Sequence, residues 1–115
     1  MTDALSQFDA ALTGGKINDQ RGADYGHPLD DFSRIGKLWG AILDIDPVPA
    51  EAVALCMEAV KISRLSQSPD HTDSIIDIAG YARCHAMILT ERAARAERVR
   101  ERPDPTPNQE THSRD

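Results

Sequence analysis

The sequence predicts an all-α fold: a four-helix bundle-like domain over residues 1–102, followed by a disordered tail at 103–115. Apolar residues recur at spacings of three and four along four segments, which is the helical period. Residues suited to helix caps and stops separate these segments, and no alternating strand pattern occurs. At 115 residues and 12.6 kDa the chain has room for one small core.

The first predicted helix begins with a cap at Thr2 or Asp3, extends to about Thr13, and carries its apolar residues at helical spacing. The polar, glycine-containing stretch from residue 16 to 27 follows and carries Tyr25. We expect it to be a functional loop held against the fold. The apolar stripe of this first helix is Leu5, Phe8 and Leu12.

The second predicted helix spans residues 28–43, because Pro28 suits a helix start and residues 44–49 contain two prolines. The third spans residues 50–66 and has a wide apolar face. The fourth begins at residue 72 or 73 and is expected to run on into the arginine-rich segment. The apolar faces of the third and fourth helices are broader than a four-helix monomer needs, so we expect a homo-oligomer. A tight monomer is the alternative.

Composition excludes several classes of protein. A net charge of −6 and a pI near 5.1 disfavour a protein that coats nucleic acid. No apolar run approaches the roughly 18 residues of a membrane span, and no leader pattern opens the chain, so we expect neither a membrane partner nor export. Cys56 and Cys84 lie in apolar periodic segments, which is typical of reduced thiols and predicts a cytoplasmic protein.

The acidic excess lies in residues 1–90, which carry seven basic and thirteen acidic side chains, whereas residues 91–115 carry six of each. Five arginines gather between Arg92 and Arg102. Glutamates are interspersed among them, which favours a solvated helix face over a surface for nucleic acid.

Charged and aromatic residues interrupt the apolar patterns of the third and fourth helices. On each helix they recur at spacings of three or four, so each set follows one side of its helix. If the two helices are antiparallel neighbours, the two sides meet in a pocket. The residues are Glu58, Lys61 and Arg64 on the third helix and Asp73, Asp77 and Tyr81 on the fourth.

This set of side chains suits a phosphorylated ligand. Lys61 and Arg64 offer a point charge and a planar fork to phosphate oxygens. Mg²⁺ prefers hard oxygen ligands and could bridge them to phosphates. Its predicted ligands are Glu58, Asp73 and Asp77.

Aromatic residues complete the predicted site. Tyr25 and Trp39 are expected to stack on a base, and Tyr81 lines the same pocket. A structural alternative has the same spacing: the two cations neutralise Asp73 and Asp77 as interhelical ion pairs, and the aromatic rings belong to the core. Spacing alone does not separate the two interpretations.

Three blocks then carry a resemblance: RGADYGHPLDDFSRIGKLW, VALCMEAVKISRL and DSIIDIAGYARC. Over residues 21–89 the chain resembles small helical phage proteins of unknown function and, more distantly, the phage nucleotide-modification-associated helical domain. More remotely it looks like the MazG-type all-α nucleotide pyrophosphatases. Such enzymes bind Mg²⁺ through an ExxE and an ExxD and release pyrophosphate from nucleoside triphosphates.

The acids implied by the MazG resemblance are only partly present. Glu58 matches the first acid of ExxE, but Lys61 stands in place of the second. Asp77 matches the last acid of ExxD, whereas Ser74 stands three residues before it and Asp73 one step further back. A cation at the position of a metal ligand weakens Mg²⁺ binding and strengthens direct phosphate binding.

We therefore expect a phage nucleotide-binding protein with its ligand between the third and fourth helices. It either hydrolyses the nucleotide as a Mg²⁺-dependent pyrophosphohydrolase with a degenerate metal site, or binds it with no cofactor. One alternative is sequestration of a nucleotide signal made by a bacterial defence system. Another is a module that binds a host protein through its acidic helical surface and has no small ligand.

Overall fold

The computed structural model describes residues 5–6, 9–10 and 25–102. Three long helices make up most of this part of the chain: α3 (Pro28–Leu43), α4 (Ala50–Gln67) and α5 (Thr72–Glu101). The described ranges contain no strand, so the predicted all-α class is confirmed. The fourth predicted helix does run on through the arginine-rich segment, because no glycine or proline interrupts residues 81–101.

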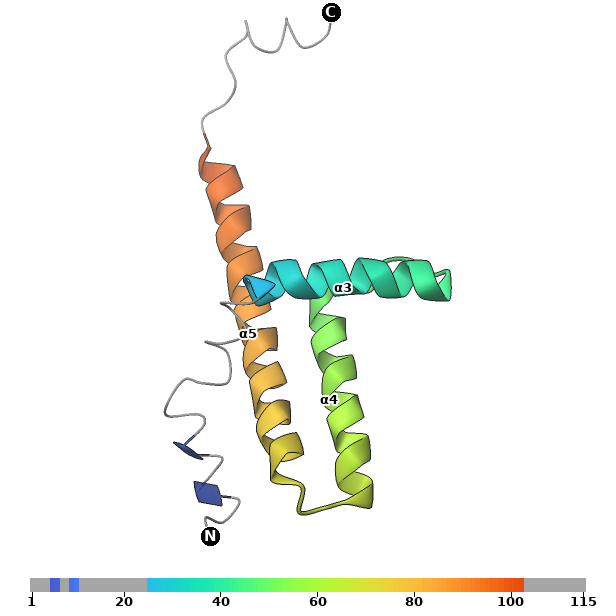
Figure 1. Cartoon of the computed structure of the whole chain (residues 1–115). Coiled ribbons are helices and arrows are strands. Elements are labelled where there is room, and N and C mark those ends of the chain that lie inside the picture. The colour runs from blue at the N-terminus through green and yellow to red at the C-terminus, as the bar shows by residue number, and fades with distance from the viewer. Residues whose placement is uncertain (1–4, 7–8, 11–24, 103–115) are drawn as a thin grey trace, which may run out of the picture.

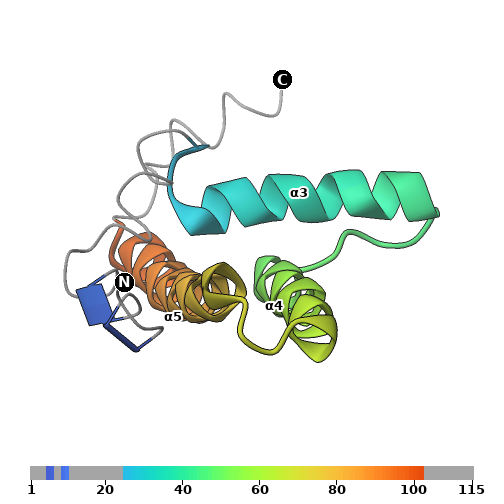
Figure 2. The ribbon, with the colours of Figure 1, turned by 60° about the horizontal axis from the view of Figure 1, so that its bottom comes forward.

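The predicted four-helix bundle is not shown: the described part of the chain has three long helices. Helices α4 and α5 run side by side as an antiparallel hairpin, and α3 lies across them as a second layer (Figures 1 and 2). Of the first predicted helix, residues 5–6 and 9–10 are helical. The rest of that helix, loop residues 16–24 and the tail at 103–115 lie outside the described residues.

Local contacts fix both ends of α3. At its start the Nδ1 atom of His27 accepts a hydrogen bond from the Leu29 backbone N–H at 3.0 Å, and Pro28 takes a position where no N–H is needed. At its end Asp44 adopts the left-handed conformation, with φ of 58°. The chain then turns back along α3, and the Ile45 N–H donates to the carbonyl oxygen of Gly40 at 2.9 Å.

The segment between α3 and α4 packs very closely against α3. A Cβ atom placed on Gly36 would lie 1.8 Å from the carbonyl oxygen of Val48, and the Val48 N–H donates to the Gly36 carbonyl oxygen at 3.1 Å. Only glycine permits this approach. The close return redirects the chain at the start of α4, so that α4 leaves α3 at an angle and does not lie along it (Figure 1).

The core lies where α3 crosses the hairpin. Its largest fully buried apolar side chains, one from each helix, are Phe32, Val53 and Ile88. The Phe32 ring lies 6.2 Å from the ring of Tyr81, measured between centroids, in a tilted arrangement. Burial of one large side chain from each helix stabilises the crossing.

Ion pairs join the three helices around this core. The guanidinium of Arg95 on α5 makes two hydrogen bonds to the carboxylate of Asp30 on α3, at 2.8 and 3.0 Å. Arg92 pairs with Glu51 at the start of α4, at 2.7 Å. Two of the arginines predicted to lie on a solvated face therefore hold α5 against its neighbours, and they lower the pKa values of Asp30 and Glu51.

Candidate functional site

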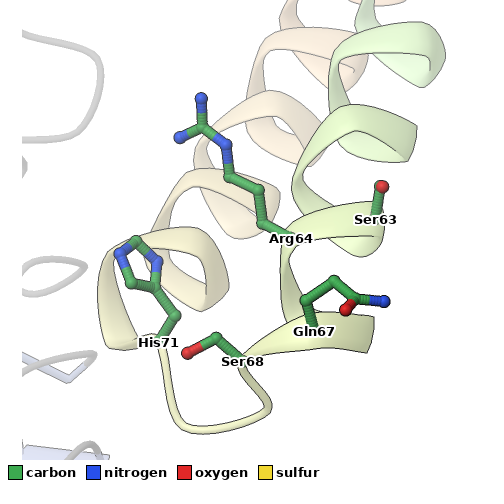
Figure 3. Close-up of a pocket in the computed structure, with 5 residues that line it drawn as sticks. All are labelled: Ser63, Arg64, Gln67, Ser68 and His71. Carbon is green, nitrogen blue, oxygen red and sulfur yellow. The ribbon is translucent and has the colours of Figure 1, made fainter.

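A cavity of about 470 Å³ opens at the turn between α4 and α5 (Figure 3). It lies at the end of the hairpin away from α3 (Figure 1). Both helices and the connection between them contribute polar side chains to it. We call it the turn pocket, and it is lined by Ser63, Arg64, Gln67, Ser68 and His71.

The backbone of the turn places these residues together. Helix α4 ends as the Ser68 N–H donates to the carbonyl oxygen of Arg64 at 2.9 Å, and the His71 N–H donates to that of Ser68 at 3.0 Å. The Ser68 hydroxyl lies 3.5 Å from a carboxylate oxygen of Asp70, so one acidic group borders the pocket. A four-residue connection thus brings the last turn of α4 to the first turn of α5.

His71 is held in one orientation by the start of α5. Its Nδ1 atom accepts a hydrogen bond from the backbone N–H of the buried residue Ser74 at 3.3 Å and lies 2.8 Å from the Ser74 hydroxyl. A neutral ring that accepts at Nδ1 carries its proton on Nε2. The Nε2–H is then the group that His71 offers to a ligand.

Arg64 is the arginine that lines the turn pocket. Its side chain is exposed and, among the residues that the structure describes, makes no ion pair. In the view of Figure 3 its guanidinium and the His71 ring extend on the same side of the hairpin, whereas Gln67 extends on the other. A guanidinium without a carboxylate partner keeps all its donors for an anion.

Lys61 and Asp77, which were both predicted at the ligand site, bind each other. The Lys61 Nζ atom lies 2.9 Å from a carboxylate oxygen of Asp77, and the lysine side chain is only 14% exposed. This contact is the interhelical ion pair of the structural alternative. It does not line the turn pocket.

The predicted aromatic residues lie away from the turn pocket. Trp39 and Tyr81 are partly buried and pack against the core. Tyr25 is 54% exposed near the start of α3, and its carbonyl oxygen accepts from the Arg34 side chain at 3.4 Å. The structure therefore brings only Arg64 of the five predicted ligand-binding residues into the pocket.

The predicted metal ligands are not brought together either. Within the described ranges no three His, Cys, Asp or Glu side chains are grouped so that they could hold a metal ion. Glu58, Asp73 and Asp77 thus form no such group in this structure. The prediction of bound Mg²⁺ gains no support from their arrangement and stays a prediction.

Four of the five pocket residues, all except Arg64, were not predicted as site residues from the sequence. Three of the four lie in the polar stretch 66–73, which joins the third and fourth predicted helices. His71 does cap α5, and the same interaction leaves its other nitrogen free for the pocket. Residues of a tight turn converge on one place, which helical spacing does not indicate.

A second cavity, of about 400 Å³, lies between the start of α3 and the middle of α5, and its lining includes His27, Arg83, Met87 and Glu91. The Arg83 guanidinium makes a hydrogen bond to the Met87 sulfur at 3.5 Å, and Glu91 pairs with Arg95 and Arg98. Its charged groups are thus bound to neighbours on the protein. The turn pocket is the better candidate for binding a ligand.

Fold and pocket define a small helical protein in which one helix crosses a hairpin and the turn of the hairpin carries the candidate site. The chain belongs to the family described as Domain of unknown function (DUF6378), which matches residues 12–89. No solved structure matches this chain. Among the helices of the described ranges, none is both long enough and apolar enough to span a membrane.

Two curated relatives come from phages. The chain is 42% identical over 66 residues to the Gene 55 protein of Mycobacterium phage L5, covering 57% of this chain and 42% of that protein. It is 36% identical over 75 residues to the Gene 55 protein of Mycobacterium phage D29, covering 65% and 49%. The chain thus spans less than half the length of each. The predicted resemblance to small phage proteins of unknown function is confirmed, whereas the MazG relation is not shown.

Proposed function

We propose that this protein binds a phosphorylated nucleotide in the turn pocket and holds it through Arg64 and His71. The observation that carries the proposal is the exposed Arg64 guanidinium, which lines a cavity without an ion-pair partner among the described residues. Unpaired guanidinium groups in cavities are typical of phosphate recognition.

The other groups of the pocket suit the same ligand. The His71 Nε2–H and the hydroxyls of Ser63 and Ser68 are hydrogen-bond donors. A volume of about 470 Å³ lies within the usual range of small-ligand sites. The acidic residue at its rim, Asp70, favours recognition of a sugar hydroxyl over a second phosphate at that side.

Binding without turnover is the form that the contacts favour. Lys61 stands at the place of a MazG-type metal ligand and is already paired with Asp77, so the acid that Mg²⁺ would need is neutralised. The proposal thus becomes sequestration of a nucleotide, with a nucleotide signal of bacterial defence as the candidate ligand. Mg²⁺-dependent release of pyrophosphate is the second form of this proposal, supported by the MazG resemblance alone.

Two further expectations belong to the proposal. A protein that intercepts a nucleotide signal acts in the cytoplasm of the host cell. The homo-oligomer expected from the broad apolar faces of α4 and α5 is compatible with one pocket in each subunit, because the turn pocket is built from a single chain.

The test is incubation of the pure protein with a panel of linear and cyclic nucleotides, with and without Mg²⁺. The supernatant and then the heat-denatured protein are analysed by mass spectrometry. We expect one nucleotide to be recovered unchanged after denaturation from the wild type and from Arg98→Ala, and not from Arg64→Ala. The control removes an exposed arginine of α5 that pairs with Glu91.

Other outcomes decide against parts of the proposal. Conversion of a nucleotide only in the presence of Mg²⁺, lost in Asp77→Ala, would replace sequestration by hydrolysis. Absence of nucleotide from both fractions would overturn the proposal and favour the module that binds a host protein.

A further inference from the structure

The lining of the turn pocket carries one full positive charge. The Arg64 guanidinium supplies it, and the other lining residues are two serines, a glutamine and His71. The Nδ1 atom of His71 accepts the backbone N–H of Ser74 at 3.3 Å, and only a ring with no proton on Nδ1 can do so. His71 therefore adds a hydrogen-bond donor to the pocket but no charge.

Carboxylates outnumber cations at this end of the hairpin. The last two turns of α4, the connection and the first two turns of α5 hold two cations and three carboxylates. One of each, Lys61 and Asp77, form the interhelical ion pair. Arg64 is the cation that remains, whereas the remaining acids are Asp70 beside the pocket and Asp73 in the first turn of α5.

The helix dipoles do not change this balance. The end of α4 brings partial negative charge to the turn and the start of α5 brings partial positive charge, so the two contributions nearly cancel. The whole chain has a net charge of −6. Any negative charge of a ligand beyond the one that Arg64 matches therefore meets acidic surroundings.

The number of charges on a phosphate depends on how it is esterified. A phosphodiester carries one negative charge, whereas a phosphomonoester carries about 1.5 to 2 at neutral pH and a triphosphate carries more. A diester also keeps two unesterified oxygens, which match two parallel N–H groups of a guanidinium. One guanidinium thus satisfies a diester in both charge and geometry.

We propose that the single positive charge of the turn pocket makes it selective for a nucleotide whose phosphate is a diester. A 3′,5′-cyclic nucleotide and a 3′,5′-linked dinucleotide both have this chemistry. Nucleoside monophosphates and triphosphates bind more weakly, because their additional charges lie near Asp70 without a cation. This inference rests on the proposed function, since it specifies the phosphate that Arg64 binds.

Equilibrium dialysis of the full chain at pH 7.5 and fixed ionic strength tests the selectivity. For each of the four bases the probes are the 3′,5′-cyclic monophosphate, the dinucleoside monophosphate, the 5′-monophosphate and the 5′-triphosphate. For the base that binds best, we expect one of the two diesters to bind about tenfold or more tightly than the 5′-monophosphate. The ratio between the two diesters shows which of them the pocket takes.

A charge reversal beside the pocket tests the electrostatic cause. Asp70→Lys adds a second cation there, so the 5′-monophosphate should gain about tenfold in affinity and the preference for the diester should disappear. Asp46→Lys is the matched control, because it makes the same change in net charge at an exposed acid. That acid lies in the segment between α3 and α4, away from the turn (Figure 1), so the preference should remain. Circular dichroism checks that both variants remain helical.

The outcomes separate this inference from the proposed function. A monophosphate or triphosphate that binds at least as tightly as both diesters, and is lost in Arg64→Ala, would overturn the diester selectivity and leave the proposed function standing. A diester preference that Asp70→Lys leaves unchanged would overturn the inference from charge. Binding of no probe, or binding that Arg64→Ala leaves unchanged, would overturn both proposals.

Discussion

The two ends of the α4–α5 hairpin use their arginines differently. At the end crossed by α3, Arg92 and Arg95 are bound to carboxylates on α4 and α3, around a core of fully buried side chains. At the turn end, Arg64 lies beside a cavity with no ion-pair partner among the described residues. The first end holds the fold together, and the second is available for a ligand.

This difference separates stability from binding along one pair of helices. Substitutions at the crossed end are expected to change the free energy of unfolding, whereas substitutions at the turn pocket are expected to change ligand affinity. A single substitution that changed both the free energy of unfolding and the ligand affinity would show that the two ends of the hairpin are not independent.

The largest effect is expected from Phe32→Ala. The Phe32 ring is fully buried where α3 crosses the hairpin, so its removal leaves a cavity and should destabilise the fold by about 3–5 kcal/mol. Chemical denaturation measures this loss. Leu38→Ala, at a residue of the same helix that is 57% exposed, should change stability by less than about 0.5 kcal/mol.

Gly36→Ala should give the next largest loss, about 1–3 kcal/mol, because its Cβ would lie 1.8 Å from the Val48 carbonyl oxygen. That overlap outweighs the gain in helix propensity of about 1 kcal/mol. Gly40→Ala is the graded comparison, with a nearest contact of 2.9 Å, and should lose less. An equally stable Gly36→Ala would show that the crossing is looser than described.

Acid should weaken the crossed end. Arginine partners lower the pKa values of Asp30, Glu51 and Glu91 below the ordinary 3.8 and 4.5, so these ion pairs contribute fully above about pH 4.5. Their contribution is lost as pH falls through the lowered pKa values. Thermal unfolding midpoints at pH 6 and pH 3 measure the loss.

The double variant Asp30→Asn, Glu51→Gln tests the source of this pH dependence. Its midpoint should fall less between pH 6 and pH 3 than that of the wild type. The same fall in both proteins would assign the pH dependence to other groups.

The smallest effect on ligand binding is expected from Lys61→Met. The Lys61 ammonium is occupied by Asp77 and lies outside the turn pocket, so nucleotide affinity should stay within about threefold of the wild type. Equilibrium dialysis with labelled nucleotide measures it. A loss of affinity comparable to that of Arg64→Ala would indicate that phosphate binds between α4 and α5, as the sequence predicts.

Much of the fold could be predicted because its signals are local. Pro28, the break at residues 44–49 and the turn at 68–71 each end or begin a helix through backbone chemistry that the sequence displays. The crossing of α3 could not be predicted in this way. It depends on the contact between Gly36 and Val48, which lie twelve residues apart.

The candidate site was less accessible to sequence reasoning. Helical spacing correctly brought Lys61 and Asp77 together, but the same spacing serves an ion pair and a phosphate site alike. Arg64 was identified, whereas His71 was not, because its role comes from a hydrogen bond that Ser74 donates to its ring. Such an orientation is a property of the folded turn.

The central claim is that the turn pocket binds phosphate through Arg64, and the most direct measurement is a titration of ¹⁵N-labelled protein with ATP followed by NMR. We predict shift changes concentrated at residues 63–71, including the Arg64 Nε–H and the His71 ring, abolished in Arg64→Ala and retained in Arg98→Ala. Changes centred on α5 residues 91–100, or unchanged by Arg64→Ala, would contradict it.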